Sequence, residues 1–191
     1  MERLRAILAS KNQGKLRELR AALAGWELEP LDADDYPPET GATYYENARR
    51  KAEFGRSLRP ADWVLGEDSG LEVEALGGAP GVRSARFAGD MHVERLLAEL
   101  EGADGDGRLA RYVCELVALT PNGEELRGTG ILEGWIANEP SGSEGFGFDP
   151  IFVPNGEERP VAALGDDWKR ENSHRARAAS SLLSQLAAER A

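Results

Sequence analysis

Short apolar segments alternate with amphipathic helical segments over the first third of this chain. The pattern predicts a short buried strand at residues 5–9 and a second strand at 26–31. Residues 14–23 between them predict a helix with its leucines on one face. Strands that alternate with helices form a sheet covered by helices, so this order predicts an α/β fold.

The rest of the chain predicts further strands and helices, with one hairpin inserted. Thr43 and Glu46 have the spacing of a capping box, which favours a helix over residues 43–54. The segment Pro121-Asn122-Gly123 favours a tight turn, and the hairpin around it makes the predicted sheet a mixed one. The other expected elements are strands at 63–66, 71–76, 110–120, 125–136 and 151–153, and helices at 92–100 and 173–190.

Length, charge and cysteine content exclude several classes of protein. The 191 residues fit one domain with a sizeable core. The net charge of −11 argues against polymeric nucleic acid and membrane surfaces as partners, because both attract basic faces. No apolar run approaches the roughly 18 residues of a membrane helix, the N-terminus lacks a signal-peptide pattern, and the single cysteine, Cys114, cannot form an internal disulfide. We therefore expect a cytoplasmic protein.

Two predicted helices begin with cations, where the helix dipole disfavours positive charge. Asn12 is a good N-cap, which places Lys15 in the first turn at a cost of a few tenths to about 1 kcal/mol. His174 and Arg175 follow a cap at Ser173 or Asn172 in the same way. A bound phosphate would make both arrangements favourable, whereas the alternative is a capped helix with solvated side chains.

Glu67 and Asp68 follow a predicted buried strand and precede Ser69-Gly70, which favours a turn. A carboxylate at such a strand end can bind Mg²⁺ or accept a proton from an attacking water. Ordinary turn chemistry is the alternative. A second acidic site at Glu39 and Glu46 could come close to Asp68, but the sequence gives no distances.

Two aromatic residues are interleaved with glycines in the segment Gly145–Pro150. The ring of Phe148 could stack on a nucleotide base, an interaction of roughly 1–3 kcal/mol in single-stranded nucleic-acid sites. The alternative is that Phe146 and Phe148 pack into the core.

With these segments in order, the chain resembles the Ham1-like inosine triphosphate pyrophosphatases over nearly its whole length. The resemblance rests on the segments described above and on further runs: Glu39-Thr40-Gly41, Glu46-Asn47-Ala48, Asp68 to Leu71, Gly77 to Val82 and Ser84 to Arg86. It implies Mg²⁺-dependent hydrolysis of ITP, dITP and XTP to the monophosphate and pyrophosphate. It also implies an elongated mixed β-sheet flanked by helices, a single domain over residues 1–191 with two lobes around a central cleft, and a homodimer.

By motif match, the resemblance also assigns roles to individual residues. Asp68 would be the general base and a metal ligand, with Ser69 touching the substrate. The residues expected to bind the triphosphate are Ser10, Lys11, Asn12, Gln13, Gly14, Lys15 and Lys51. Those expected around the nucleoside are Phe146, Gly147, Phe148 and Asp149, with Lys169, His174 and Arg175 as the remaining substrate-binding positions.

The chain departs from the family pattern at Pro38, where some members carry a metal-binding glutamate three residues before the glycine that matches Gly41. Glu39 is the expected second metal ligand, while Glu46 and Glu67 remain alternatives.

Two other functions fit the same residues. One is a non-catalytic nucleotide sensor, and the other is a pyrophosphatase with a different base preference. The pair of carboxylates argues against the sensor, because acids beside phosphates are unfavourable unless a metal ion lies between them.

Overall fold

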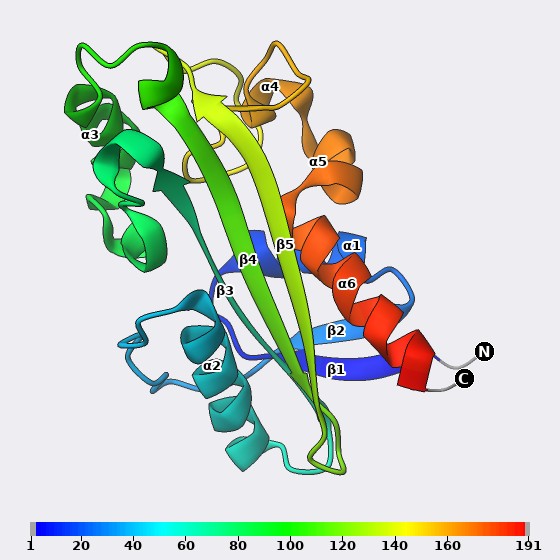
Figure 1. The fold of residues 1–191 in the computed structure, drawn as a ribbon. Coiled ribbons are helices and arrows are strands. Elements are labelled where there is room, and N and C mark those ends of the chain that lie inside the picture. The colour runs from blue at the N-terminus through cyan, green and yellow to red at the C-terminus, as the bar shows by residue number, and fades with distance from the viewer. Residues whose placement is uncertain (1–2, 190–191) are drawn as a thin grey trace. The chain divides into compact units, whose positions relative to one another are not determined.

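The computed structural model describes residues 3–189 and contains one mixed, six-stranded sheet with the strand order β2-β1-β3-β4-β5-β6 (Figure 1). This confirms the predicted α/β fold. The strands are β1 (Leu4–Leu8), β2 (Trp26–Pro30), β3 (Trp63–Val73), β4 (Leu109–Leu119), β5 (Glu125–Ile136) and β6 (Phe152–Pro154). The helices are α1 (Gln13–Ala22), α2 (Tyr44–Leu58), α3 (His92–Glu99), α4 (Val161–Leu164), α5 (Asp166–Asn172) and α6 (His174–Glu189).

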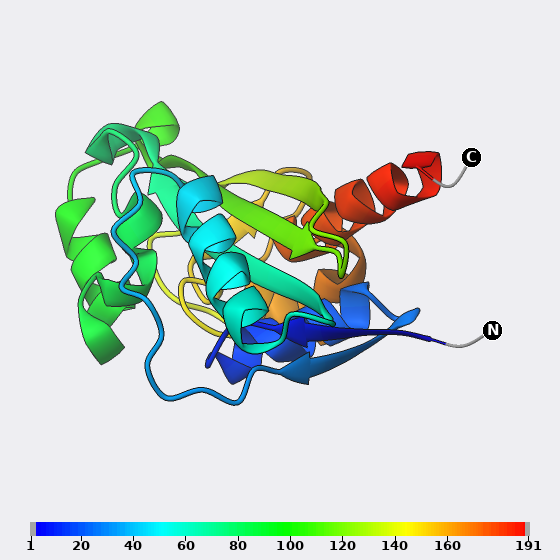
Figure 2. The same ribbon diagram turned by 90° about the horizontal axis from the view of Figure 1, so that it is seen from below.

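The N-terminal strands pair as expected of an α/β fold. β1 is parallel to both β2 and β3, with Ile7 opposite Glu29 on one side and Val64 on the other. β5 and β6 are antiparallel, so the sheet is mixed. The connection from β2 to α2 forms neither helix nor strand and is the long blue coil in Figure 2.

The predicted turn at Ser69-Gly70 is wrong. β3 continues through it as one strand of 11 residues, Trp63–Val73, which contains the strand expected at 63–66 and the first part of the one expected at 71–76. Residues 74–76 form a short 3-10 helix instead of a strand. The carboxylates of Glu67 and Asp68 meet buried cations, which removes the reason for the chain to turn them towards solvent. The helices α4 and α5 were not predicted from the sequence. The last residue of the expected C-terminal helix, at position 190, lies outside the described residues.

Contacts divide the chain into two compact units. Unit 1 comprises residues 1–68, 114–130 and 174–191, and unit 2 comprises residues 69–113 and 131–173. Unit 1 has a core in which Leu8, Leu16 and Leu19 pack with Leu116 and Leu182, and its helices α1 and α6 lie side by side (Figure 1).

Unit 2 has a core of its own. Leu71 and Leu96 pack there with Tyr112, Phe148 and Phe152. No helix in the described part of the chain is long and apolar enough to cross a membrane.

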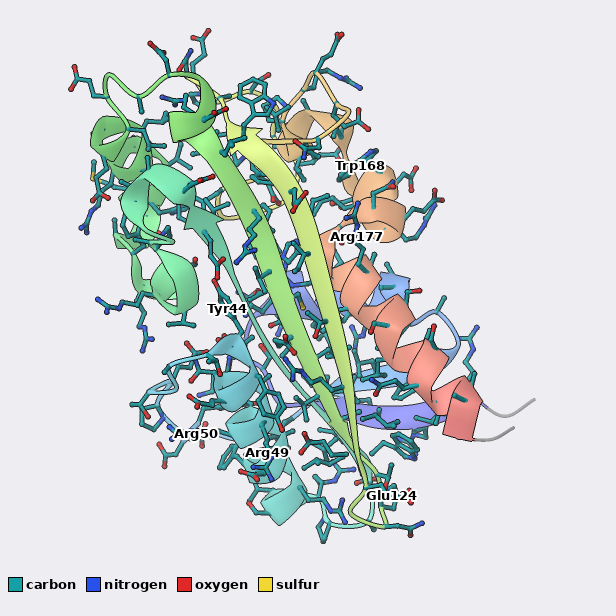
Figure 3. All side chains as sticks on the ribbon, viewed as in Figure 1. Tyr44, Arg49, Arg50, Glu124, Trp168 and Arg177 are labelled. Atoms are coloured by element: carbon teal, nitrogen blue, oxygen red, sulfur yellow. The ribbon has the colours of Figure 1, made fainter. Side chains whose placement is uncertain are left out.

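Glycines in the strands of unit 1 let helices approach the sheet closely. A side chain at Gly66 would overlap the backbone of Ala48 in α2, and one at Gly130 would overlap the carbonyl of His174 in α6. α2 is also held to the start of β5, where Arg49 Nε donates to the Glu125 carboxylate at 2.9 Å. Figure 3 labels Arg49 and Glu124, which precedes Glu125. These contacts fix the helices that carry the charged residues described next.

Candidate active site

Lys15 lies in the first turn of α1 and meets a carboxylate there. The Asn12 side chain caps the helix by accepting a hydrogen bond from the Lys15 backbone N–H, as predicted. The Lys15 Nζ lies 2.7 Å from Glu67 Oε2, on the fully buried carboxylate of β3. Glu67 therefore offsets the unfavourable interaction between this cation and the helix dipole.

The same carboxylate holds Arg175, which is in the first turn of α6. Arg175 Nε donates to Glu67 Oε1 at 3.0 Å, and Arg175 Nη1 donates to Glu18 Oε2 at 2.9 Å. Burial alone would raise the pKa of the Glu67 carboxyl, but Lys15 and Arg175 together hold it well below its usual range. Unit 1 thus contains a buried chain of alternating charges, Lys15–Glu67–Arg175–Glu18.

Lys51 in α2 meets the next carboxylate of β3. Its ammonium lies 3.1 Å from Asp68 Oδ1 and donates to the Glu67 carbonyl at 3.0 Å. It also forms an ion pair with Glu39 Oε1. Asp68 Oδ2 accepts a hydrogen bond from Asn47 Nδ2 at 3.0 Å. Burial raises the pKa of the Asp68 carboxyl, an effect that Lys51 reduces but does not cancel.

The three carboxylates considered as the second metal ligand, Glu39, Glu46 and Glu67, have different partners in the structure. Glu46 closes the predicted capping box of α2 and accepts from the Ala42 N–H at 2.7 Å. Glu67 is enclosed by Lys15 and Arg175. Glu39 shares a cation with Asp68, so this pair is the one suited to a metal ion. Within residues 3–189, no group of three or more His, Cys, Asp or Glu side chains could hold a metal, and Mg²⁺ commonly uses one or two protein carboxylates.

In unit 2, Asp149 and Lys169 form a further buried ion pair, with Lys169 Nζ 2.6 Å from Asp149 Oδ2. The same carboxylate accepts from the Phe146 N–H at 2.9 Å and from the Tyr112 hydroxyl at 3.3 Å. Gly145 has a φ of +81°, and a side chain there would overlap Asp149. The glycine therefore allows the loop to wrap around this carboxylate.

The two phenylalanines of this loop have different surroundings. Phe148 is 3 % exposed and packs against Phe87 and edge-on against His92. Its burial supports the core-packing alternative. Phe146 is half-buried, and Lys169 Nζ lies 5.0 Å from the centre of its ring. Phe146 is thus the more accessible aromatic surface of the two.

The remaining residues expected at the site have the following positions. Ser10 Oγ accepts from the Asn12 N–H, Lys11 donates to the Asp34 carbonyl, and Gln13 and Gly14 open α1. Ser69 continues β3, the Gly147 carbonyl lies 2.9 Å from His92 Nε2, and His174 begins α6 with 3 % of its surface exposed.

Sequence reasoning missed three partners of these residues. Glu18 and Tyr112 gave no local signal, because their partners lie far away in the sequence. Asn47 could have been found, since it precedes Lys51 by four residues and so lies on the same face of α2. Its amide joins two segments of unit 1, accepting from the Gly41 N–H at 2.8 Å while donating to Asp68.

Cys114 lies in β4, fully buried, with Sγ 3.6 Å from Glu67 Oε1. Burial, reinforced by the Glu67 charge, raises the pKa of the Cys114 thiol well above its usual range. The group is therefore a neutral thiol that can donate weakly to the carboxylate.

The chain is similar to known proteins over most of its length. A model of the Ham1 family matches residues 6–185. The dITP/XTP pyrophosphatase of Bacillus licheniformis is 41% identical over 190 residues, covering 94% of this chain and 96% of that protein. The dITP/XTP pyrophosphatase of Symbiobacterium thermophilum is 43% identical over 194 residues, covering 98% of each.

Solved structures are similar over the same length. A HAM1 protein from Coxiella burnetii superimposes with a TM-score of 0.83 at 36% identity, covering 97% of this chain and 99% of that one. The Ham1 protein of Staphylococcus aureus gives a TM-score of 0.81 at 34% identity, with the same coverage.

Proposed function

This chain belongs to the Ham1 family, and from that premise we propose that it hydrolyses dITP, XTP and ITP to the nucleoside monophosphate and pyrophosphate. Such an enzyme removes non-standard purine nucleotides before they enter DNA or RNA. The observation that carries the proposal is in unit 1. Asp68, a buried carboxylate with a raised pKa, shares the buried cation Lys51 with Glu39. The preceding residue, Glu67, binds two further buried cations, Lys15 and Arg175.

Asp68 is proposed as the general base. It would accept a proton from a water that attacks the α-phosphorus, while the bond from that phosphorus to the bridging oxygen breaks. Pyrophosphate leaves with the electron pair of that bond. Asn47 donates to Asp68 Oδ2 and so holds the orientation of this carboxylate.

The cations are proposed to bind the phosphate groups. Lys15 and Arg175 are fixed by Glu67 before any substrate arrives, and fixed charges stabilise a developing anion without reorganising. The backbone N–H groups at the start of α1 supply further donors. The chain's net charge of −11 makes this local concentration of positive charge necessary for a polyanionic substrate.

The donor set near Asp68 fits a magnesium ion, and an ammonium already occupies a position between Glu39 and Asp68. These two side chains would hold the metal. When bound, Mg²⁺ supplies positive charge that offsets the charge of the phosphates and of the leaving pyrophosphate.

The nucleoside is proposed to contact the residues of unit 2, namely Phe146, Gly147, Asp149 and Lys169, with Phe148 packed beneath them. Hypoxanthine and xanthine carry a 6-oxo acceptor, whereas adenine has a 6-amino donor. Protein donors that pair with the 6-oxo group would be left unpaired by adenine, which is strongly unfavourable. We also propose a cytoplasmic homodimer with no polymeric nucleic-acid partner.

The test is release of pyrophosphate from dITP, XTP, ITP, GTP and ATP with Mg²⁺. We expect fast release from the first three. Asp68→Asn should retain the fold and lower kcat by roughly 100-fold or more, as loss of a general base does. Asp62→Asn is the matched control, because Asp62 pairs with Arg59 at the surface.

Release of orthophosphate would contradict the proposal, since it places the attack at the γ-phosphorus. Tight binding of dITP without turnover would support the nucleotide sensor instead. Equal rates of pyrophosphate release from all five nucleotides would support the proposed reaction but contradict the proposed base preference.

A further inference from the structure

Lys51 occupies a position where a metal ion would be expected. Its ammonium contacts three oxygens: Asp68 Oδ1 at 3.1 Å, the Glu67 carbonyl at 3.0 Å, and Glu39 Oε1. Lys51 is 7 % exposed and Asp68 is 3 % exposed. The ammonium is thus a buried cation that links the two carboxylates proposed as metal ligands.

The carboxylates come from segments that are themselves held together. Glu39 lies in the connection between β2 and α2, and Asp68 lies in β3. The Asn47 amide joins these segments, because its oxygen accepts from Gly41 and its nitrogen donates to Asp68. A close pair of carboxylates in a poorly solvated place repels unless a cation lies between them. Lys51 meets that need in the absence of metal.

We propose that Lys51 is a built-in counter-ion that a divalent cation must displace. This inference rests on the proposed function, because it takes Glu39 and Asp68 as metal ligands. Metal binding is then an exchange of one cation for another at the same oxygens. The displaced ammonium keeps its place on α2 and becomes available to an incoming phosphate, which couples metal binding to binding of the triphosphate.

The structure allows this exchange with little movement. α2 is anchored at its start by the capping box of Thr43 and Glu46; Figure 3 labels Tyr44 in the first turn, and Asn47 and Lys51 follow along the helix. The lysine stem is flexible, so its ammonium can move while the helix stays still. The hydrogen bond from Asn47 to Asp68 Oδ2 can remain throughout.

The exchange predicts that removing Lys51 strengthens metal binding. We expect nucleotide-free Lys51→Met to bind Mn²⁺, used alone as the probe, at least about tenfold more tightly than the wild type. In the wild type, Mn²⁺ binds only the fraction of molecules whose Lys51 ammonium has left the carboxylates, and the apparent affinity falls by that fraction. Isothermal titration calorimetry measures the affinity. Mn²⁺ should also raise the Tm of Lys51→Met by more than that of the wild type.

The control is Lys169→Met, which also removes a buried lysine from an aspartate, here Asp149 in unit 2. Its Mn²⁺ affinity should match that of the wild type. The double variant Lys51→Met/Asp68→Asn should lose the gain. Lys51→Gln, which retains a hydrogen-bond donor, should show the same direction of change if Lys51→Met folds poorly by circular dichroism.

Equal or weaker Mn²⁺ binding by folded Lys51→Met or Lys51→Gln would overturn the proposal, as would no binding in either protein. A gain of the same size in Lys169→Met would also overturn it, because the effect would then be one of overall charge. The proposed function is tested separately by wild-type pyrophosphate release from dITP, which does not depend on these affinities.

Discussion

Glu67 is the residue on which the buried charges of unit 1 depend, since it binds both Lys15 and Arg175. Its lowered pKa in the folded chain stabilises the fold above the ordinary glutamate value of 4.5, and that contribution is lost as the pH falls below it. Glu67→Gln should therefore lower the free energy of unfolding by about 3–5 kcal/mol at neutral pH, because two cations lose a buried partner. It should also flatten the acid limb of the stability curve.

Urea unfolding over a series of pH values measures this difference. Glu53→Gln serves as the control, because Glu53 is an exposed partner of Arg49, and it should leave the curve unchanged. An acid limb as steep in Glu67→Gln as in the wild type would show that other groups set the pH dependence.

The two phenylalanines of the 145–150 loop should separate binding from stability. Phe148→Ala removes a ring from the core of unit 2 and should lower the free energy of unfolding by about 3–5 kcal/mol. Phe146→Ala should change stability by about 1 kcal/mol or less and raise KM for dITP about tenfold through lost stacking. Thermal unfolding and steady-state kinetics on both variants test this. An unchanged KM in Phe146→Ala would remove its ring from the nucleoside contact.

What could be predicted at this scale depended on the distance between partners along the sequence. The Asn12 cap and the Thr43–Glu46 box involve residues three apart and were confirmed. The pairing of Glu67 with Arg175 joins residues 108 positions apart, and no local pattern encodes it. The sequence alone showed that the cations in the first turns of α1 and α6 are unfavourably placed in the helix dipole. Their protein partners, however, are carboxylates that the sequence did not connect to them.

At the scale of elements, Gly130 in β5 determines how closely α6 approaches the sheet. A methyl group there would overlap the His174 carbonyl, so Gly130→Ala should cost about 1–3 kcal/mol. It should also displace the first turn of α6, which carries Arg175, and lower kcat/KM for dITP. Gly25→Ala is the control, because nothing lies within 4 Å of its added methyl group. An unchanged kcat/KM in Gly130→Ala would mean that β5 shifts to accommodate the methyl group while the first turn of α6 stays in place.

The elements were largely predictable where apolar periodicity and turn residues agreed. β1, α1, β2 and the β4–β5 hairpin lie close to the expected residues. β3 was divided wrongly, because Glu-Asp-Ser-Gly resembles an exposed turn and only buried cations from α1, α2 and α6 make it a strand interior. α4 and α5 are short helices, which leave a weak periodic signal.

For the whole molecule, the chain passes between the two units three times within an unbroken strand, in β3, β4 and β5. We therefore predict one cooperative unfolding transition. Leu19→Ala in unit 1 and Leu96→Ala in unit 2, both fully buried, should each lower the stability by about 2–5 kcal/mol and retain a single transition. Leu58→Ala, at a side chain 50% exposed, is the control. Two separate transitions in calorimetry would contradict the prediction of a single domain.

Because Cys114 is buried and is the chain's only cysteine, its chemical labelling can report local opening of unit 1. The thiol is enclosed beside Glu67 and protonated, so a thiol reagent in solution cannot reach a reactive thiolate in the closed state. The rate of labelling then measures the frequency with which unit 1 opens around Cys114. A ligand that binds Lys15 and Arg175 should lower this labelling rate, and no cysteine has to be engineered into the chain for the measurement.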